Sequence, residues 1–575
     1  MPIEQPPDLV FAQLIMAWNE GRLSDLFFHN DQRPKGIGDH ELGSAIAELH
    51  NSGEINVLSL SRPEALAKHS GHHFFIGQNL FLKVIPKLNA SLDEVAACVA
   101  ALVNQGGADL AATLPNGAFR EWCEADPERG DEVIWRALRG DEAIEPFLVF
   151  GLQAVRDLGR TLNCIESETK AVQMSGITAS ARLAAPTSEE RDAIYGAYAG
   201  VLERGADPDV IANILSALFV LASEGKDFTC ARVIDIARIC LSEATEGVCH
   251  VAAQALCHSR VPTECDLWVD LFRVLLATKP ENKGTVIELD VGLRNLLEGE
   301  RAEHAIDFVA QLVSGSDGKV SLEDLSSFSH ALLENDHELH GYAVGSWLVY
   351  GEPAICDSLG RVAGLHEKAT IIPISRFSLT EVQKVKLCKR AIGFLMLHPV
   401  LAASVLVSVA RDCEPDTGMQ IAGLLYNPIL VNYSGRVREY LVGVGPEDAA
   451  HKVVTAALDA LEKFIVGLEN VGELRELQPS TNERFIGSMR EFDEAKKVHQ
   501  DAHRQSVFAN LVRRSTVLYG DKTISHVIGS DGQKRRFEME LHSHSVSFEM
   551  PRMLTFAPVQ FDYMLRLFRT ERVVE

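Results

Sequence analysis

Two histidines lie two residues apart in the stretch LHSHSVSFEM near the end of the printed sequence, at His542 and His544. On a β-strand this spacing directs both imidazoles to one face, where they could supply two ligands to a metal ion. The same face continues into apolar side chains, which favours packing against a core over an open metal site. These apolar residues are Val546, Phe548 and Met550. We therefore expect both histidines to be structural.

A metal site on this strand would need further ligands, and the best source is the sequence HQDAH. Its histidines, His499 and His503, are four residues apart, so on a helix both rings can reach one ion. The segment lacks the glutamate of the zinc-protease motif, and the charged residues around it are typical of a solvated helix face. We predict no metal and no cofactor. The alternative is a metal-dependent hydrolase or nuclease that uses all four histidines.

Other stretches resemble chemical motifs without meeting their spacing. Cys249 and Cys257 are eight residues apart, or about 12 Å along one helix, too far to share a tetrahedral metal, so we expect both to be core thiols. The stretch SGSDGKVS at 314–321 lacks the glycine spacing and the Ser or Thr of a phosphate-binding loop. We identify no catalytic residue and predict a non-catalytic protein, with the enzyme above as its alternative.

The charge of the chain is uneven. A formal net charge of −25 argues against a general nucleic-acid binder, because phosphate contacts need clustered Lys and Arg. From residue 484 onward, however, basic residues slightly outnumber acidic ones. A basic patch there gives a second alternative, a subunit that contacts nucleic acid or another anion. The patch would consist of Lys496, Lys497, Arg513, Arg514, Lys534, Arg535 and Arg536.

The middle of the chain has the pattern of one helix after another. Asp207 is a good N-cap, Pro208 suits the first helical position, an apolar face that includes Leu218 follows, and Gly225 supplies a stop. Similar patterns start near residues 227, 247, 263 and 321, so two helices with their loops make a unit of roughly 36–40 residues. The step and the architecture resemble HEAT-type repeats, although their sequence motif is absent. Residues 91–445 are therefore predicted to form a HEAT-like α-solenoid.

Capping boxes support the helical body. Each pairs a hydroxyl N-cap with a carboxylate three residues later. The three boxes are Ser91 with Glu94, Thr187 with Glu190, and Ser378 with Glu381. The run ATIIPIS at 369–375 is an exception and reads as a loop crossing or a short edge strand.

The two ends of the chain differ from the body. Residues 1–90 are predicted to be mixed α/β, with a helix, a turn at Gly53 and a short strand in the outline of a winged-helix fragment. Residues 446–515 carry a heptad-like apolar pattern and are predicted to form a long helical hairpin. Residues 516–575 alternate in polarity around an Asp-Gly turn and are predicted to be a small β-rich module that ends in a short helix.

Composition sets the broad class. The chain is 46% hydrophobic and 23% charged, which is ordinary for a folded protein, and no uninterrupted apolar run reaches the ~18 residues of a spanning helix. The first residues lack the basic and small residues of a secretory signal, and eleven cysteines without a C-x-x-C pair indicate reduced thiols. We therefore predict a cytoplasmic scaffold or adaptor subunit that binds a partner protein and no membrane.

Overall fold

The structure is a computed structural model of the chain, and it divides into two compact units, Met1–Asn335 and Asp336–Glu575. The structure describes residues 7–34, 37–183, 186–315, 320–335, 337–363, 368–471, 479–505, 522–528, 534–540 and 549–574.

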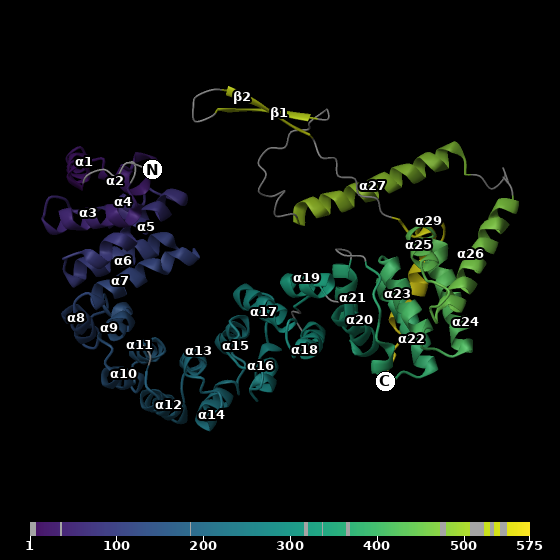
Figure 1. Cartoon of the computed structure of the whole chain (residues 1–575), viewed down its shortest axis with the longest axis horizontal. Helices are drawn as coiled ribbons and strands as arrows, with labels where there is room; N and C mark the ends of the chain where they lie inside the picture. The colour runs from purple at the N-terminus through teal and green to yellow at the C-terminus, as the bar shows by residue number, and fades with distance from the viewer. Residues whose placement is uncertain are drawn as a thin grey trace. The chain divides into compact units, whose positions relative to one another are not determined.

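The first unit is helical throughout its described residues (Figure 1). Its α-helices are α1 (Pro7–Asn19), α2 (Leu23–Phe28), α3 (Asp39–Asn51), α4 (Pro63–Leu66), α5 (His72–Val84), α6 (Leu92–Gly106), α7 (Leu114–Glu124), α8 (Pro127–Ala137), α9 (Leu148–Val155), α10 (Leu158–Ile165), α11 (Lys170–Ser180), α12 (Ser188–Glu203), α13 (Pro208–Gly225), α14 (Ala231–Cys240), α15 (Glu246–Cys257), α16 (Trp268–Leu275), α17 (Lys283–Leu296), α18 (Ala302–Ser314) and α19 (Ser326–Asn335).

These helices recur in pairs. From α7 to α19, each odd-numbered helix packs on the next odd-numbered one, and even-numbered helices lie along the other side of that row (Figure 1). Helices α11, α13, α15 and α17 begin 38, 38 and 37 residues apart, within the expected 36–40. The structure is thus consistent with a helical repeat.

Helix α13 forms for the reasons that its sequence indicates. The carboxylate of Asp207 accepts a hydrogen bond from the backbone N–H of Asp209 at 2.9 Å, and Pro208 occupies the first turn. By length and composition α13 is the one helix among the described residues that could cross a membrane. Leu218 is nevertheless fully buried, as are the residues of the apolar face around it, so the helix has the packing of a core helix.

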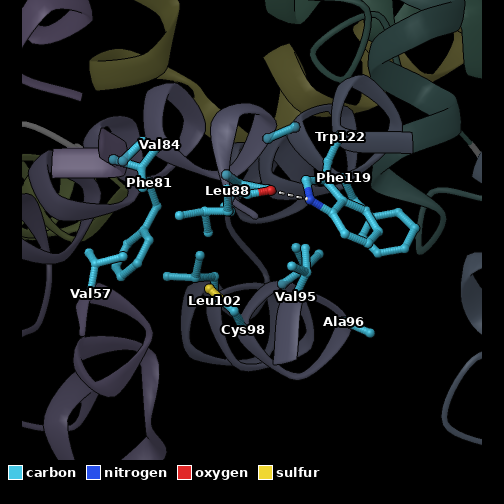
Figure 2. Packing of buried hydrophobic residues seen from close by; sticks show 14 of the residues in the cluster. Val57, Phe81, Val84, Leu88, Val95, Ala96, Cys98, Leu102, Phe119 and Trp122 are labelled. Carbon is cyan, nitrogen blue, oxygen red and sulfur yellow. Dashed lines mark hydrogen bonds between the residues drawn. The ribbon is translucent and has the colours of Figure 1, made fainter. Parts of the chain in front are cut away.

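A continuous apolar core fills the start of the first unit. Figure 2 shows Phe81, Val95 and Phe119 converging from α5, α6 and α7. Trp122 is 1% exposed, and its indole N–H donates to the backbone carbonyl oxygen of Leu88 at 2.9 Å, which satisfies its polar atom inside the core. These three consecutive helices therefore share one interior.

The expected strand in residues 1–90 does not form. Helix α3 ends as predicted and Gly53 has a φ of 81°, but the following segment is a 3₁₀ helix, Val57–Ser61. Val57 and Leu60 are buried against the neighbouring helices, and the described residues of this region hold no strand. Local strand propensity is outweighed here by packing, and the winged-helix outline is wrong.

The second unit is mostly helical. Its α-helices are α20 (His337–Tyr350), α21 (Pro353–Val362), α22 (Glu381–Leu395), α23 (Pro399–Ala410), α24 (Pro415–Leu424), α25 (Arg436–Val442), α26 (His451–Val471), α27 (Thr481–Gln505), α29 (Arg552–Phe556) and α30 (Pro558–Arg569). A π-helical turn, Leu425–Leu430, follows α24. Helix α22 packs on α23, α24 and α30 and lies at the centre of this unit.

Residues 369–373 cross the unit without a strand partner, and a 3₁₀ helix, Ile374–Phe377, follows. The backbone N–H groups of Thr370 and Ile372 each donate at 3.0 Å to serine hydroxyls of α23, Ser404 and Ser408 respectively. These serines replace the neighbouring strand that such a segment would otherwise need. The segment is therefore the loop crossing of the two expected alternatives.

The capping boxes are confirmed at two of three positions. Ser91 and Thr187 cap α6 and α12 with their glutamates. At the third position the box forms two residues later, between Thr380 and Gln383, because the chain at Ser378 adopts a left-handed φ of 48°.

The β-rich C-terminal module is not supported. Strands β1 (Lys522–Ile528) and β2 (Lys534–Glu540) form one antiparallel hairpin, with Ile528 opposite Lys534 on the two sides of the predicted turn. The residues described after it, 549–574, form two helices that pack with the helical body instead. The predicted hairpin forms, but the helices after it pack with the α-helical unit and do not build a β-rich module.

Candidate interaction site

The last described residues of the chain return to the second unit and attach to it along their length. We call residues 549–573 the C-terminal clasp. At its start, the carboxylate of Glu549 accepts hydrogen bonds from the backbone N–H groups of Gly435 at 3.0 Å and Arg436 at 3.3 Å, at the first turn of α25. The backbone N–H of Met553 then donates at 2.8 Å to the side chain of Asn432, which is fully buried.

Helix α30 anchors the other end of the clasp on α22. The backbone of Phe568 and Arg569 approaches Gly393 so closely that a Cβ there would lie 2.9 Å from the Arg569 nitrogen. Arg569 also donates from Nε to the carbonyl oxygen of Gly393 at 2.7 Å. Phe561 of α30 is 5% exposed. The clasp is thus fixed to the body by its backbone as well as by its side chains.

The opposite side of the clasp is apolar and exposed. Phe556 and Val559 are 82% and 83% exposed, and Tyr563 is 63% exposed. Val559 and Tyr563 line an open recess whose walls are almost entirely apolar. The other residues of the recess are Ala557, Pro558 and Gln560. Large apolar side chains gathered in this way mark an interaction surface more often than scattered single ones do.

Helix α27 presents a second apolar face. It begins with a capping box, in which the Ser480 N–H donates to the Glu483 carboxylate at 2.7 Å and the Glu483 N–H donates to the Ser480 hydroxyl at 3.2 Å. These hydrogen bonds from Ser480 lower the pKa of the Glu483 carboxyl below its usual range. The helix start is therefore defined locally, without tertiary packing.

The apolar residues of α27 recur at helical spacing and stay exposed. Phe485, Met489 and Phe492 follow the i, i+4, i+7 pattern of one face and are 63%, 47% and 64% exposed, with Ile486 beside them. The expected helical hairpin would have buried this face against α26. The apolar pattern of α26 packs against the body at its first half instead, where Val454 and Leu461 are buried.

The side chains of the four histidines in the metal-site alternative fall outside the described part of the chain. His499 and His503 lie on α27, four residues apart as expected, but only their backbone is described. His542 and His544 lie outside the described residues. The prediction that these histidines hold no metal, and its metal-site alternative, are therefore both untested.

The predicted basic patch is described in part. Lys496 and Lys497 are exposed on α27, next to the apolar face. Arg536 is exposed on β2 and forms an ion pair with Glu538 at 2.5 Å, which offsets its charge locally. Lys534 and Arg535 lie on the same strand, and Arg513 and Arg514 lie outside the described residues. The anion-binding patch stays a prediction.

Of the two cysteines that were expected in the core, Cys249 is buried and Cys257 is not. Burial raises the pKa of the Cys98 thiol to about 12, and Cys249 is 3% exposed. Cys257, by contrast, is only partly buried, because it ends α15 at the edge of the helix rows. The prediction of a core thiol at Cys257 is wrong.

Comparisons with known proteins leave the family open. No family model matches the chain, and no curated protein matches it. Among solved structures, an engineered protein from the Northeast Structural Genomics Consortium aligns over 74% of this chain and 97% of that chain, at 15% sequence identity and a TM-score of 0.24. A likeness at that TM-score carries no argument, so function rests on the site alone.

Proposed function

We propose that this chain is a non-catalytic helical-repeat scaffold or adaptor subunit that binds a partner protein. The paired helices of the first unit, which recur every 37 or 38 residues from α11 to α17, support an α-solenoid of the HEAT type. Such stacked pairs expose a long surface whose usual role is binding. The fold analogy supports the class, and the exposed apolar faces supply the site.

The observation that carries the proposal is the exposed face of α27. An amphipathic helix gains little stability from displaying two phenylalanines and a methionine to water, whereas a partner groove can bury them at the i, i+4 and i+7 positions. The C-terminal clasp adds exposed aromatic and aliphatic side chains in the same unit. Aromatic anchors of this kind dominate the binding free energy of protein interfaces. The proposed ligand is a protein with an apolar groove.

Site-specific photocrosslinking in the native cell tests this function. A benzoyl-phenylalanine at position 485, 489 or 492 lies on the apolar face, and the same residue at position 490, 491 or 494 lies among charged, exposed positions of the same helix. We expect one dominant protein adduct from the apolar positions. The yield of that adduct from the charged positions should be at least tenfold lower. Mass spectrometry of the adduct identifies the partner.

Equal labelling from both sets of positions would contradict the proposal, as would an adduct formed only within the chain itself. A nucleic-acid adduct would instead favour the basic-patch alternative. That alternative, the hydrolase or nuclease alternative and the cytoplasmic location all remain predictions from the sequence.

A further inference from the structure

A group of metal-ligating side chains lies in the first unit, far in sequence from the histidines considered above. The Sγ of Cys257, a ring nitrogen of His258 and a carboxylate oxygen of Glu288 all lie within 4.8 Å of one another. Two of the ligands come from the end of α15 and one from the middle of α17, the next helix of the same row. Among the described residues this is the one such group of three.

Close packing of α15 on α17 creates the group. A Cβ on Gly292 would lie 2.6 Å from the Leu256 Cβ and 2.9 Å from the Cys257 nitrogen, so only glycine permits this approach. Asn295 then donates from its side-chain amide to the Cys257 carbonyl oxygen at 3.1 Å. The two contacts fix the last turn of α15 against α17, about one and two helical turns beyond Glu288.

The turn after α15 fixes the second ligand. Ser259 has a φ of 50°, a left-handed conformation that costs a residue with a side chain about 1 kcal/mol or more. The turn closes through hydrogen bonds from the Ser259 N–H to the Leu256 carbonyl oxygen at 3.1 Å and from the Arg260 N–H to the Ala255 carbonyl oxygen at 2.9 Å. His258 is thereby held beside Cys257 while it remains accessible to solvent.

The donor set matches a borderline transition metal. Thiolate, imidazole and carboxylate together are ligands of zinc, and catalytic zinc sites use three protein ligands with one position left open. A tetrahedral zinc separates its ligand atoms by roughly 3.5 Å, so side-chain rotations alone can close a group that already lies within 4.8 Å.

The carboxylate of Glu288 places a negative charge beside the Cys257 thiol. A bound zinc ion would replace the thiol proton, which leaves to solvent, and would neutralise the thiolate and the carboxylate together.

We propose that Cys257, His258 and Glu288 form a binding site for one zinc ion, with a fourth coordination position open to water or to a ligand from a partner protein. This site does not depend on the proposed contact through α27. It also differs from the arrangement rejected from the sequence, since Cys249 takes no part.

Metal binding by the full chain, purified without a polyhistidine tag and stripped with a chelator, tests the site. Zinc affinity is measured by competition with a chromophoric chelator, and cobalt absorption reports thiolate coordination. We expect the wild type to bind one equivalent of zinc. Zinc binding should be at least tenfold weaker in Cys257→Ser, His258→Ala and Glu288→Gln. The cobalt–thiolate absorption band should disappear in Cys257→Ser.

Two matched variants serve as controls. Cys230→Ser removes another partly exposed thiol, and His304→Ala removes another exposed imidazole. Both should bind zinc as the wild type does. Circular dichroism confirms the fold of every variant, and Glu288→Gln keeps the shape of the side chain. Absence of stoichiometric binding in the wild type would overturn the proposal, and so would binding that the three variants leave unchanged.

Discussion

Arg390 and Glu571 join two parts of the second unit that lie 181 residues apart in the chain. The Nη1 of Arg390 donates to the backbone carbonyl oxygen of Glu571 at 3.0 Å, and its Nη2 donates to the carbonyl oxygen of Gly351. The guanidinium also lies over the Phe394 ring, 5.6 Å from its centroid, and the residue is 4% exposed. One buried cation on α22 thus ties the clasp to the turn between α20 and α21.

The first prediction concerns this arginine. Arg390→Met should loosen the clasp by about 2–4 kcal/mol, because two partly buried carbonyl oxygens lose a charged donor. Hydrogen–deuterium exchange in α22 and α30 should accelerate by at least tenfold. Lys452→Met, at an exposed position of the same unit, is the control and should leave exchange unchanged. Unaltered exchange in Arg390→Met would mean that the clasp is held by other contacts.

The second prediction concerns the core of α13. Leu218 is fully buried, so Leu218→Ala should reduce the free energy of unfolding by about 2–5 kcal/mol. Ile239→Ala, on the neighbouring α14, truncates a side chain that is 51% exposed and should cost less than about 1 kcal/mol. Urea denaturation compares the two variants. Equal destabilisation would show that burial does not distinguish these positions.

Helix type and spacing could be predicted where they depend on local chemistry. The N-cap at Asp207 and the apolar face of α13 act within a few residues, so the sequence states them directly. The start of a helix cannot be predicted in the same way where its N-terminal residue bonds to a side chain distant in sequence. Asp227 was expected to begin a helix, but its carboxylate accepts from Arg191 at 2.6 Å and from Tyr195 at 2.9 Å, and α14 begins at Ala231.

In the candidate sites too, the features that depend on nearby residues can be predicted from the sequence, and those that depend on tertiary packing cannot. The apolar periodicity of α27 is visible in the sequence, but its exposure depends on where α26 packs. The group at Cys257 and Glu288 joins residues 31 positions apart, through an approach that Gly292 alone permits. The adjacent Cys257 and His258 are the signal present in the sequence, but local spacing does not reveal Glu288 as their neighbour.

The third prediction concerns Gly292. Gly292→Ala should destabilise the first unit by about 1–3 kcal/mol, because the new methyl group meets the backbone of α15. It should also weaken zinc binding by moving Cys257 away from Glu288. Gly196→Ala, in α12 with no atom within 4 Å of the added Cβ, should instead stabilise by about 0.5–1 kcal/mol. Thermal denaturation of both variants checks the opposite signs.

The fourth prediction is a pH dependence at Asp448. Its carboxylate accepts from Arg411 Nη2 at 2.8 Å and from the Ala450 N–H at 2.9 Å, and the hydrogen bond from Arg411 lowers the pKa of Asp448 below its usual range. A lowered folded-state pKa means that the carboxylate stabilises the fold above the unfolded pKa of about 4. The contribution is lost as pH falls through the folded value.

Asp448→Asn should therefore destabilise the second unit at pH 7 by about 1–3 kcal/mol, the usual worth of hydrogen bonds to a charged group. The difference from the wild type should stay constant down to about pH 5 and shrink below about pH 4. Urea denaturation at a series of pH values measures it. If the difference in unfolding free energy between Asp448→Asn and the wild type persists unchanged below about pH 4, the charge of Asp448 is not the cause of that difference.

The last prediction separates an exposed apolar face from a buried one. Phe492→Asp should change the free energy of unfolding by less than about 0.5 kcal/mol, because the ring is 64% exposed and a surface substitution removes little packing. Phe561→Asp, at the 5% exposed position of α30, should cost about 3 kcal/mol or more, since it both empties a core position and buries a carboxylate. Urea denaturation of the purified chain measures both. If Phe492→Asp proves as damaging as Phe561→Asp, the face of α27 is covered within the chain itself and is not the partner contact; if it is neutral yet abolishes the crosslinked adduct, the face is used for binding alone.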